Sequence, residues 1–120
     1  LGSPWRMPTT NEIVLLCKGA TGTGWVAWGT VGGAWGSYGG VPGGYFNGTS
    51  ASPTTLFFPA SGFRSGSDGS FGNVSSHGYY WSSTINNSSN SYNLQFNQSN
   101  GAIPQNNNNR SNGFPVRCVQ

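Results

Sequence analysis

The segment Tyr92-Asn93-Leu94-Gln95-Phe96 alternates apolar and polar side chains, which is the period of a β-strand with one buried face. It lies within residues 73–112, which contain twelve of the chain's fourteen Asn and nine Ser. Tyr79-Tyr80-Trp81 is a second strand-like segment in this tract, and Phe114-Pro115-Val116-Arg117-Cys118 alternates just after it. Low-complexity disorder would lack such segments. The pattern therefore predicts polar loops mounted on a sheet, where binding sites are usually found.

The chain before this tract also favours a β-rich, loop-rich domain. Thr54-Thr55-Leu56-Phe57-Phe58 predicts a buried strand ended by Pro59, and residues 65–70 predict a turn. Residues 19–50 are rich in Gly and contain six large aromatic residues. We interpret them as loops and short strands whose rings fill the core. The alternative is that some rings form an exposed platform for sugars, and the sequence does not indicate which ones.

One helix is predicted near the N-terminus, over residues 10–18. Thr9-Thr10-Asn11-Glu12 fits a capping box, in which Thr9 is the N-cap and Glu12 bonds back to it. Ile13, Leu16 and Cys17 then share one apolar face at helical spacing.

The composition excludes several classes of function. The 120 residues suit a single domain, and we expect it to span residues 1–120, either alone or as the C-terminal part of a longer protein. The five cations are scattered, so we expect no nucleic-acid partner. No apolar run is long enough to predict insertion into a membrane. Glu12 and Asp68 are the only acids and His77 is the only His, so we expect no enzyme activity, no cofactor and no metal site.

Four ordered segments carry a resemblance to a known family. The segments are Trp5–Glu12, Leu56–Arg64, Gly78–Thr84 and Asn109–Val119. They resemble the "WRLPT..E", "LPAAGYR", "G-YWSS" and "R..GFSVRCV" segments of the Fibrobacter succinogenes major paralogous domain. The resemblance implies an α+β, β-rich and loop-rich C-type-lectin-like fold of the formylglycine-generating-enzyme-like group. Arg110 and Arg117 match family positions, where they would bond loop carbonyls.

The Asn-rich tract resembles a narrower set, the variable proteins of diversity-generating retroelements in bacteria or phages. In these systems an error-prone reverse transcriptase rewrites adenines, and the templates are rich in Asn codons. Adenine substitution in such codons gives residues such as Ser, Tyr and His, and unaltered codons remain Asn. Residues 86–91 and 106–109 have this composition.

The resemblance also implies a disulfide between Cys17 and Cys118, because C-type-lectin-like domains commonly join their helix to their last strand. Two free thiols are the alternative. A disulfide would favour an oxidising compartment. We therefore expect the domain to be extracellular, at a cell surface or on a phage particle.

The leading functional hypothesis is a ligand-binding display domain whose loops, about residues 77–112, form a variable binding face. Its ligand would be an unidentified protein or glycan on a cell or host surface. The alternative is a structural or adhesive surface domain of the same fold, at a fimbrial or fibre tip, without programmed variation. The expected ligand-binding residues are His77, Tyr79, Tyr80, Asn86, Asn87, Ser88, Ser89, Asn90, Asn93, Gln95, Asn97, Asn100, Asn106, Asn107, Asn108, Asn109, Ser111 and Asn112.

Overall fold

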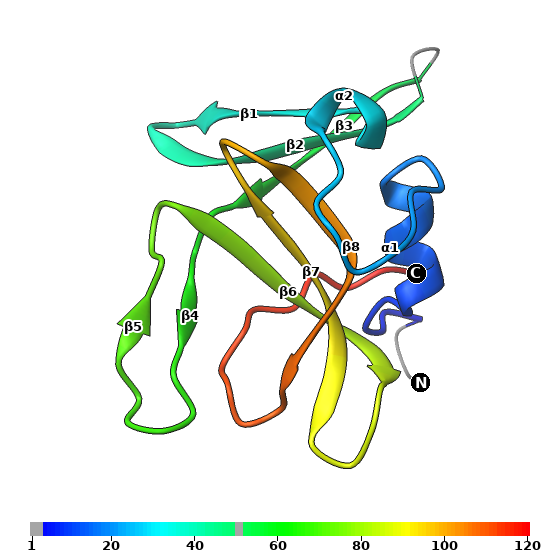
Figure 1. Ribbon diagram of the computed structural model, residues 1–120. Helices are drawn as coiled ribbons and strands as arrows, with labels where there is room; N and C mark the ends of the chain where they lie inside the picture. The colour runs from blue at the N-terminus through cyan, green and yellow to red at the C-terminus, as the bar shows by residue number, and fades with distance from the viewer. Residues whose placement is uncertain (1–3, 50–51) are drawn as a thin grey trace.

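The computed structural model describes residues 4–49 and 52–120 and is β-rich, with three antiparallel sheets and two short helices (Figure 1). The helices are α1 (Thr10–Leu16) and α2 (Trp28–Val31). The first sheet is formed by β1 (Gly33–Tyr38), β2 (Val41–Thr49) and β3 (Ser52–Pro59). The short hairpin β4 (Phe63–Arg64) and β5 (Phe71–Gly72) is the second sheet. The third is formed by β6 (His77–Ile85), β7 (Asn90–Asn97) and β8 (Gly101–Asn109).

The predicted capping box of α1 is confirmed. The Glu12 amide donates to the Thr9 hydroxyl, and the Thr9 amide donates to the Glu12 carboxylate at 2.8 Å. The helix ends at Leu16, two residues before the predicted limit, because Cys17 is already the C-cap and Lys18 has a positive φ. Ile13 and Cys17 are buried, as their spacing predicted.

The third sheet is a meander in which each strand pairs with the next along the chain. The strands predicted around Tyr79–Trp81 and Tyr92–Phe96 are confirmed as parts of β6 and β7. The run Asn106–Asn109, which we expected to be a loop, is instead the second half of β8 and pairs with β7. Its polar side chains do not prevent pairing, because backbone groups form the ladder whatever the side chain is.

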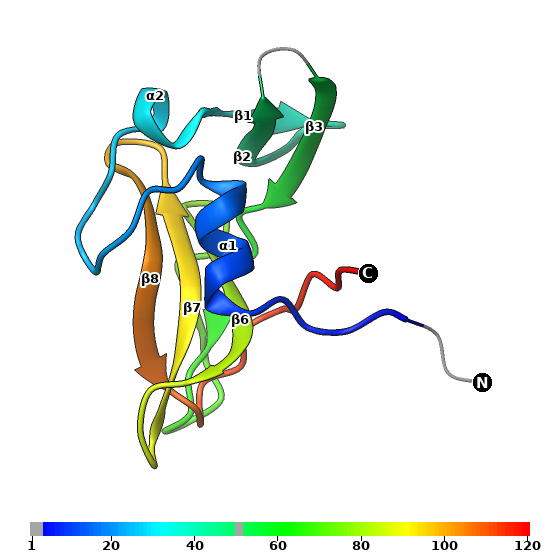
Figure 2. The same ribbon diagram turned by 90° about the vertical axis from the view of Figure 1, so that its right-hand side faces the viewer.

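One core joins the first and third sheets to α1. Figures 1 and 2 show β1–β3 lying across one end of β6–β8, with α1 beside them. Phe96 of β7 is fully buried at this junction, and its ring lies 5.4 Å from Phe46 of β2 and 6.1 Å from Tyr80 of β6. Ile13 and Cys17 of α1 complete the same cluster. The expectation that the rings of the Gly-rich segment fill the core is confirmed in part: Phe46 is buried and Trp28 and Trp35 pack against the core, whereas Trp25 and Tyr38 are exposed.

A second aromatic cluster covers the opposite face of β6. Tyr79 packs against Phe63 and Phe114, and Trp81 stacks on Phe114 with ring centroids 4.3 Å apart. We expected one of the two adjacent tyrosines to face outward. Both Tyr79 and Tyr80 are buried instead, because the β4 residue Phe63 and the C-terminal residue Phe114 cover the face that Tyr79 occupies.

The C-terminal residues 114–119 do not form the predicted strand. They are extended and contact neighbours at single points: Val119 forms a bridge with Arg6, and the Pro115 carbonyl accepts from the Trp81 amide at 3.1 Å. The Arg117 guanidinium donates to the carbonyl of Phe57 at 2.7 Å, so this segment is attached to β3 by a side chain instead.

The expected disulfide is absent, because Cys17 and Cys118 are both free thiols. Cys17 is fully buried in the core behind α1, and burial raises its pKa to about 12. Cys118 is exposed on the C-terminal segment. Because both thiols are free, the argument from a disulfide to an oxidising compartment no longer holds.

Candidate functional site

Three polar turns from separate parts of the chain meet at one end of the molecule, opposite β1–β3 (Figure 1). They are the β4–β5 turn (65–70), the β6–β7 turn (86–89) and residues 109–112, which begin at the last residue of β8, and together we call them the loop end. The Arg110 amide donates to the Ser89 carbonyl at 2.8 Å, which joins the second turn to the third. The Gly66 amide donates to the Asn112 side chain at 3.0 Å, which joins the first to the third.

Each of the three turns is shaped by an Asp or Asn side chain that accepts from the backbone two residues ahead. Asp68 accepts from the Ser70 amide at 3.0 Å, Asn87 from the Ser89 amide at 2.9 Å, and Asn109 from the Ser111 amide at 2.9 Å. These Asx turns explain why such residues are used here. The hydrogen bonds from Ser70 also lower the pKa of the Asp68 carboxyl.

The charges at the loop end are few and engaged locally. The Arg64 guanidinium lies 4.2 Å from the centre of the exposed Phe71 ring and donates to the Gly69 carbonyl. The Arg110 guanidinium donates to the Ser88 carbonyl, as its match to the family position implied. The rest of the loop end offers hydroxyl, amide and backbone groups, which together can donate and accept hydrogen bonds.

A ladder of amide side chains runs along one face of β7 and β8. Asn108 donates to Asn93 at 3.1 Å, and Asn106 donates to Gln95 at 2.7 Å. Gln95 also donates to the Tyr79 hydroxyl at 3.3 Å, and the Asn97 amide lies 3.2 Å from the His77 ring. We call Asn93, Gln95, Asn106 and Asn108 the amide ladder. Their side chains bond one another, so they are less available to an external ligand than expected.

The structure thus divides the predicted binding residues into three groups. The exposed residues at the loop end are Asn86, Asn87, Ser88, Ser89, Asn109 and Ser111. The partly buried residues are His77, Asn90, Gln95, Asn97, Asn106, Asn107, Asn108 and Asn112. The buried residues are Tyr79, Tyr80 and Asn93.

Two of these placements correct the expected binding face. Asn93 was expected to point outward, but it is 0% exposed: it lies on the central strand between Trp81 and Asn106 and accepts from Asn108. Asn100 is exposed, but it lies in the β7–β8 turn at the opposite end of the sheet from the β6–β7 turn. The predicted residues therefore do not form one continuous surface.

The sequence reasoning missed the β4–β5 turn as part of the site. Ser67, Asp68 and Ser70 were interpreted as a plain turn, and they are one, but that turn lies beside residues 110–112. The two segments are neighbours because Arg64 of this hairpin pairs with Gly113, which is far along the chain. No local signal predicts such a contact.

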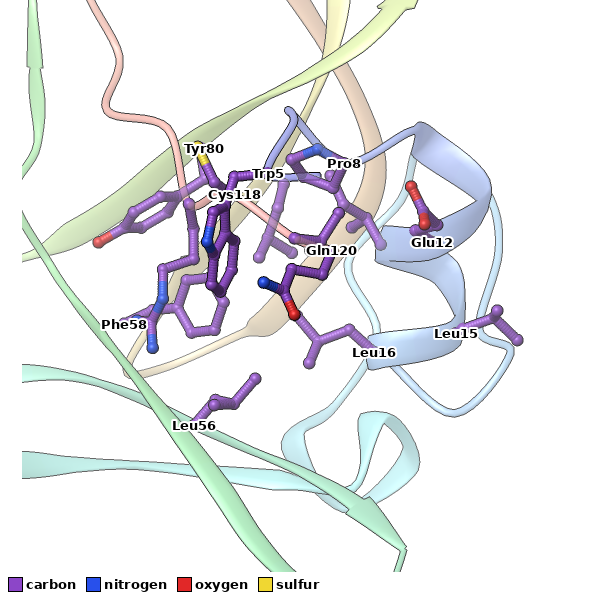
Figure 3. Close-up of a pocket in the computed structure, with 14 residues that line it drawn as sticks. Trp5, Pro8, Glu12, Leu15, Leu16, Leu56, Phe58, Tyr80, Cys118 and Gln120 are labelled. Carbon is purple, nitrogen blue, oxygen red and sulfur yellow. The ribbon is translucent and has the colours of Figure 1, made fainter. Parts of the chain in front are cut away.

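A separate apolar pocket lies between α1, β3 and the C-terminal segment, and has a volume of about 570 Å³ (Figure 3). Leu16, Leu56 and Phe58 are among its apolar residues. Of the charged residues in its lining, Glu12 bonds Arg6, and Arg117 stacks over Phe58 with 4.8 Å to the ring centre. The hydrogen bond from Arg6 and that from the Thr9 backbone lower the pKa of Glu12 to about 2. Glu12 is therefore ionised near neutral pH and does not exchange a proton there.

Within residues 4–49 and 52–120, no three residues of the types His, Cys, Asp and Glu approach one another closely enough to hold a metal ion. Burial lowers the pKa of His77, whose ring contacts Ser76 and Asn97. Among the same residues, no helix has the length and apolar character needed to span a membrane.

Comparison with known proteins identifies a family without an assigned activity. No curated protein and no solved structure shows significant similarity to the chain. A family described as "Domain of unknown function (DUF8237)" matches residues 43–119, from β2 to the C-terminal segment. This match includes the loop end, the amide ladder and both aromatic clusters. Because it covers more than half of the sequence, the chain belongs to the DUF8237 family.

Proposed function

We propose that this protein is a ligand-binding display domain that binds its ligand through the loop end. The supporting observation is the convergence of three exposed polar turns on a fixed sheet, linked through Arg110–Ser89 and Gly66–Asn112. A rigid scaffold that carries adaptable polar loops is the arrangement used by binding proteins. The ligand is a protein or glycan on a cell or host surface, and the domain acts outside the cell or on a phage particle.

The same proposal includes the C-type-lectin-like fold and the variable proteins of diversity-generating retroelements. It is supported by the four ordered sequence segments and by the capped helix at Thr9–Leu16. The composition of the β6–β7 turn, Asn86-Asn87-Ser88-Ser89, supports it further, because these side chains are exposed and are Asn or a product of adenine substitution in Asn codons.

A structural or adhesive surface domain is the second candidate, and the amide ladder favours it. Asn93, Gln95, Asn106 and Asn108 bond one another and would stabilise a fixed sheet, with no need to vary. The two candidates therefore differ in the positions at which they predict sequence variation: display predicts it at the loop end, and a structural domain does not.

Sequencing of the coding region from many isolates separates the two candidates. Display predicts adenine-directed substitutions at the codons for residues 86–89 and 109–111, together with a nearby template repeat and a reverse transcriptase. Asn93 is the matched control, because its codon has the same two adenines while its side chain is buried. An invariant loop end, or equal variation at Asn93, would contradict display.

A further inference from the structure

The register of the first sheet gathers aromatic residues on the face that points away from the core. Ala34 pairs with Tyr45, Gly36 with Gly43, and Tyr38 with Val41. Residues directly opposite each other in an antiparallel pair lie on the same face, so these side chains share one surface. Phe57 of β3 joins them, because it pairs with Tyr45. We call Tyr38, Tyr45 and Phe57 the outer aromatic row.

Two glycines allow these rings to lie against the sheet. A Cβ atom at Gly36 would come within 3.0 Å of the Tyr45 ring, and one at Gly43 within 2.8 Å of the Phe57 ring. The Tyr45 hydroxyl donates to the Ser37 carbonyl at 2.6 Å, which fixes that ring further. The ring centroids are 4.9 Å apart for Tyr45 and Phe57, and 5.7 Å apart for Tyr38 and Phe57.

The row is uncharged and partly exposed: Tyr38 is open to solvent, whereas Tyr45 and Phe57 are half-buried. The strands β1, β2 and β3 contain no Asp, Glu, Lys or Arg. Tyr38 is 69% exposed and the neighbouring Val41 is 46% exposed. The exposed part of the row is therefore the Tyr38 ring with its neighbour Val41.

The dimensions of the row favour a narrow ligand. Three strands span about 10 Å, and the four steps from Val41 to Tyr45 span about 13 Å. A stable protein interface buries about 800 Å² on each partner, which is several times the area available here. The apolar faces of a pyranose ring fit an aromatic ring, and the tyrosine hydroxyls at the edge can bond sugar hydroxyls.

We propose that the outer aromatic row is a binding site for a neutral glycan chain of β-linked pyranose rings. Equatorial substitution leaves both faces of each ring flat and apolar. The Tyr38 and Tyr45 rings are tilted by 41° and 54° against Phe57, so a chain that twists from one sugar to the next can place successive rings on them. This site is independent of the loop end, which lies at the other end of the molecule (Figure 1).

Native affinity electrophoresis in gels that contain soluble mixed-linkage β-glucan tests this site. The full chain should be retarded by the β-glucan and not by dextran, an α-linked glucan. Tyr38→Ala should weaken the binding about fivefold, as expected for the loss of one ring contact. Its exposure makes this a change that the fold tolerates. Gly36→Ala should also weaken binding, because the added methyl group would displace the Tyr45 ring.

Phe71→Ala is the matched control, because it removes another exposed aromatic ring, from the β4–β5 hairpin, and should leave the retardation unchanged. Equal losses in Tyr38→Ala and Phe71→Ala, or no retardation of the wild type, would overturn the proposal. Sedimentation that shows a dimer abolished by Tyr38→Ala would also overturn it, since a second copy would then cover the row. Ser88→Ala alters only the loop end, so a change in the retardation of this variant reports on the display proposal and not on the outer aromatic row.

Discussion

Asparagine has two different roles in this protein, and the position of each residue on the sheet decides which role it has. Asn87 lies in an exposed turn and accepts from the amides of Ser89 and Asn90 at 2.9 and 2.8 Å. Asn93 lies on a strand, is fully buried, and accepts from Asn108. The first role shapes a surface that solvent reaches, and the second satisfies polar groups inside the molecule.

Asn93→Ala should therefore lower the free energy of unfolding by about 1–3 kcal/mol, because it removes a fully buried side chain and leaves the partly buried Asn108 amide without its acceptor. Asn86→Ala is the control, since Asn86 is exposed in the adjacent turn, and it should change stability by less than about 0.5 kcal/mol. Urea unfolding of both variants measures the difference. Equal effects would show that the amide ladder does not stabilise the sheet.

The two thiols should react at very different rates. The exposed Cys118 should react with an aromatic disulfide reagent at once in the native protein. Cys17, whose pKa burial raises to about 12, should react only after denaturation. Counting the released chromophore before and after adding guanidinium checks this. Two slow thiols in non-reduced protein, released together by reductant, would instead reveal a disulfide.

At the scale of elements, α1 depends on one ion pair and one capping box that share a carboxylate. Glu12 accepts from Arg6 at 2.6 Å and from the Thr9 amide at 2.8 Å. These contacts lower its pKa from 4.5 to about 2. A depressed folded pKa contributes stability above the unfolded value, and this contribution is lost as the pH falls through the folded value.

The stability of the wild type should therefore decrease between about pH 4.5 and pH 2 more steeply than that of Glu12→Gln. The variant removes the titrating group while it keeps a capping side chain. Asp68→Asn is a useful comparison, because the pKa of Asp68 is also lowered, by hydrogen bonds from Ser70 rather than by an ion pair. Thermal melts across this pH range measure both. Parallel curves for wild type and Glu12→Gln would show that the Arg6 contact does not stabilise α1.

The sequence predicted those elements whose causes are local. The capping box set the start of α1, and the alternation in Tyr92–Phe96 set β7. The strand β8 was missed because Asn106–Asn109 has low strand propensity, and its pairing with β7 overrides that preference. The segment 114–119 was wrongly predicted as a strand because alternation does not supply a neighbour to pair with.

The candidate site was only partly predictable for the same reason. Composition identified the β6–β7 turn and residues 109–112 as exposed and polar. It failed for Tyr79, because its cover comes from Phe63 and Phe114, and for Asn93, which accepts from Asn108; all three of these partners are distant in the sequence. The outer aromatic row also required the register of three strands, although the sequence allowed an exposed aromatic platform.

At the scale of the whole molecule, the two proposed binding regions lie at opposite ends of one structural unit (Figure 1). Phe96 connects the two larger sheets, because its ring contacts Phe46 of the first sheet and Tyr80 of the third. Gly78 faces the same ring so closely that any side chain there would collide with it. The first and third sheets therefore share a single core.

The two ends should consequently unfold together. Trp28 and Trp35 pack on Phe96 from the first-sheet side and Trp81 stacks on Phe114 beside the third sheet, so tryptophan fluorescence reports on the packing of both sheets, while far-ultraviolet circular dichroism reports on the strands as a whole. We expect one urea transition that coincides for both probes. Phe96→Ala should lower the free energy of unfolding by about 3–5 kcal/mol and shift both probes equally, because the cavity lies between the two sheets. Phe71→Ala, which removes an exposed ring of the same type, should shift neither by more than about 0.5 kcal/mol. If Phe96→Ala separated the transitions, each sheet would be a stable unit by itself, and the loop end could then change its ligand without any constraint from the aromatic end.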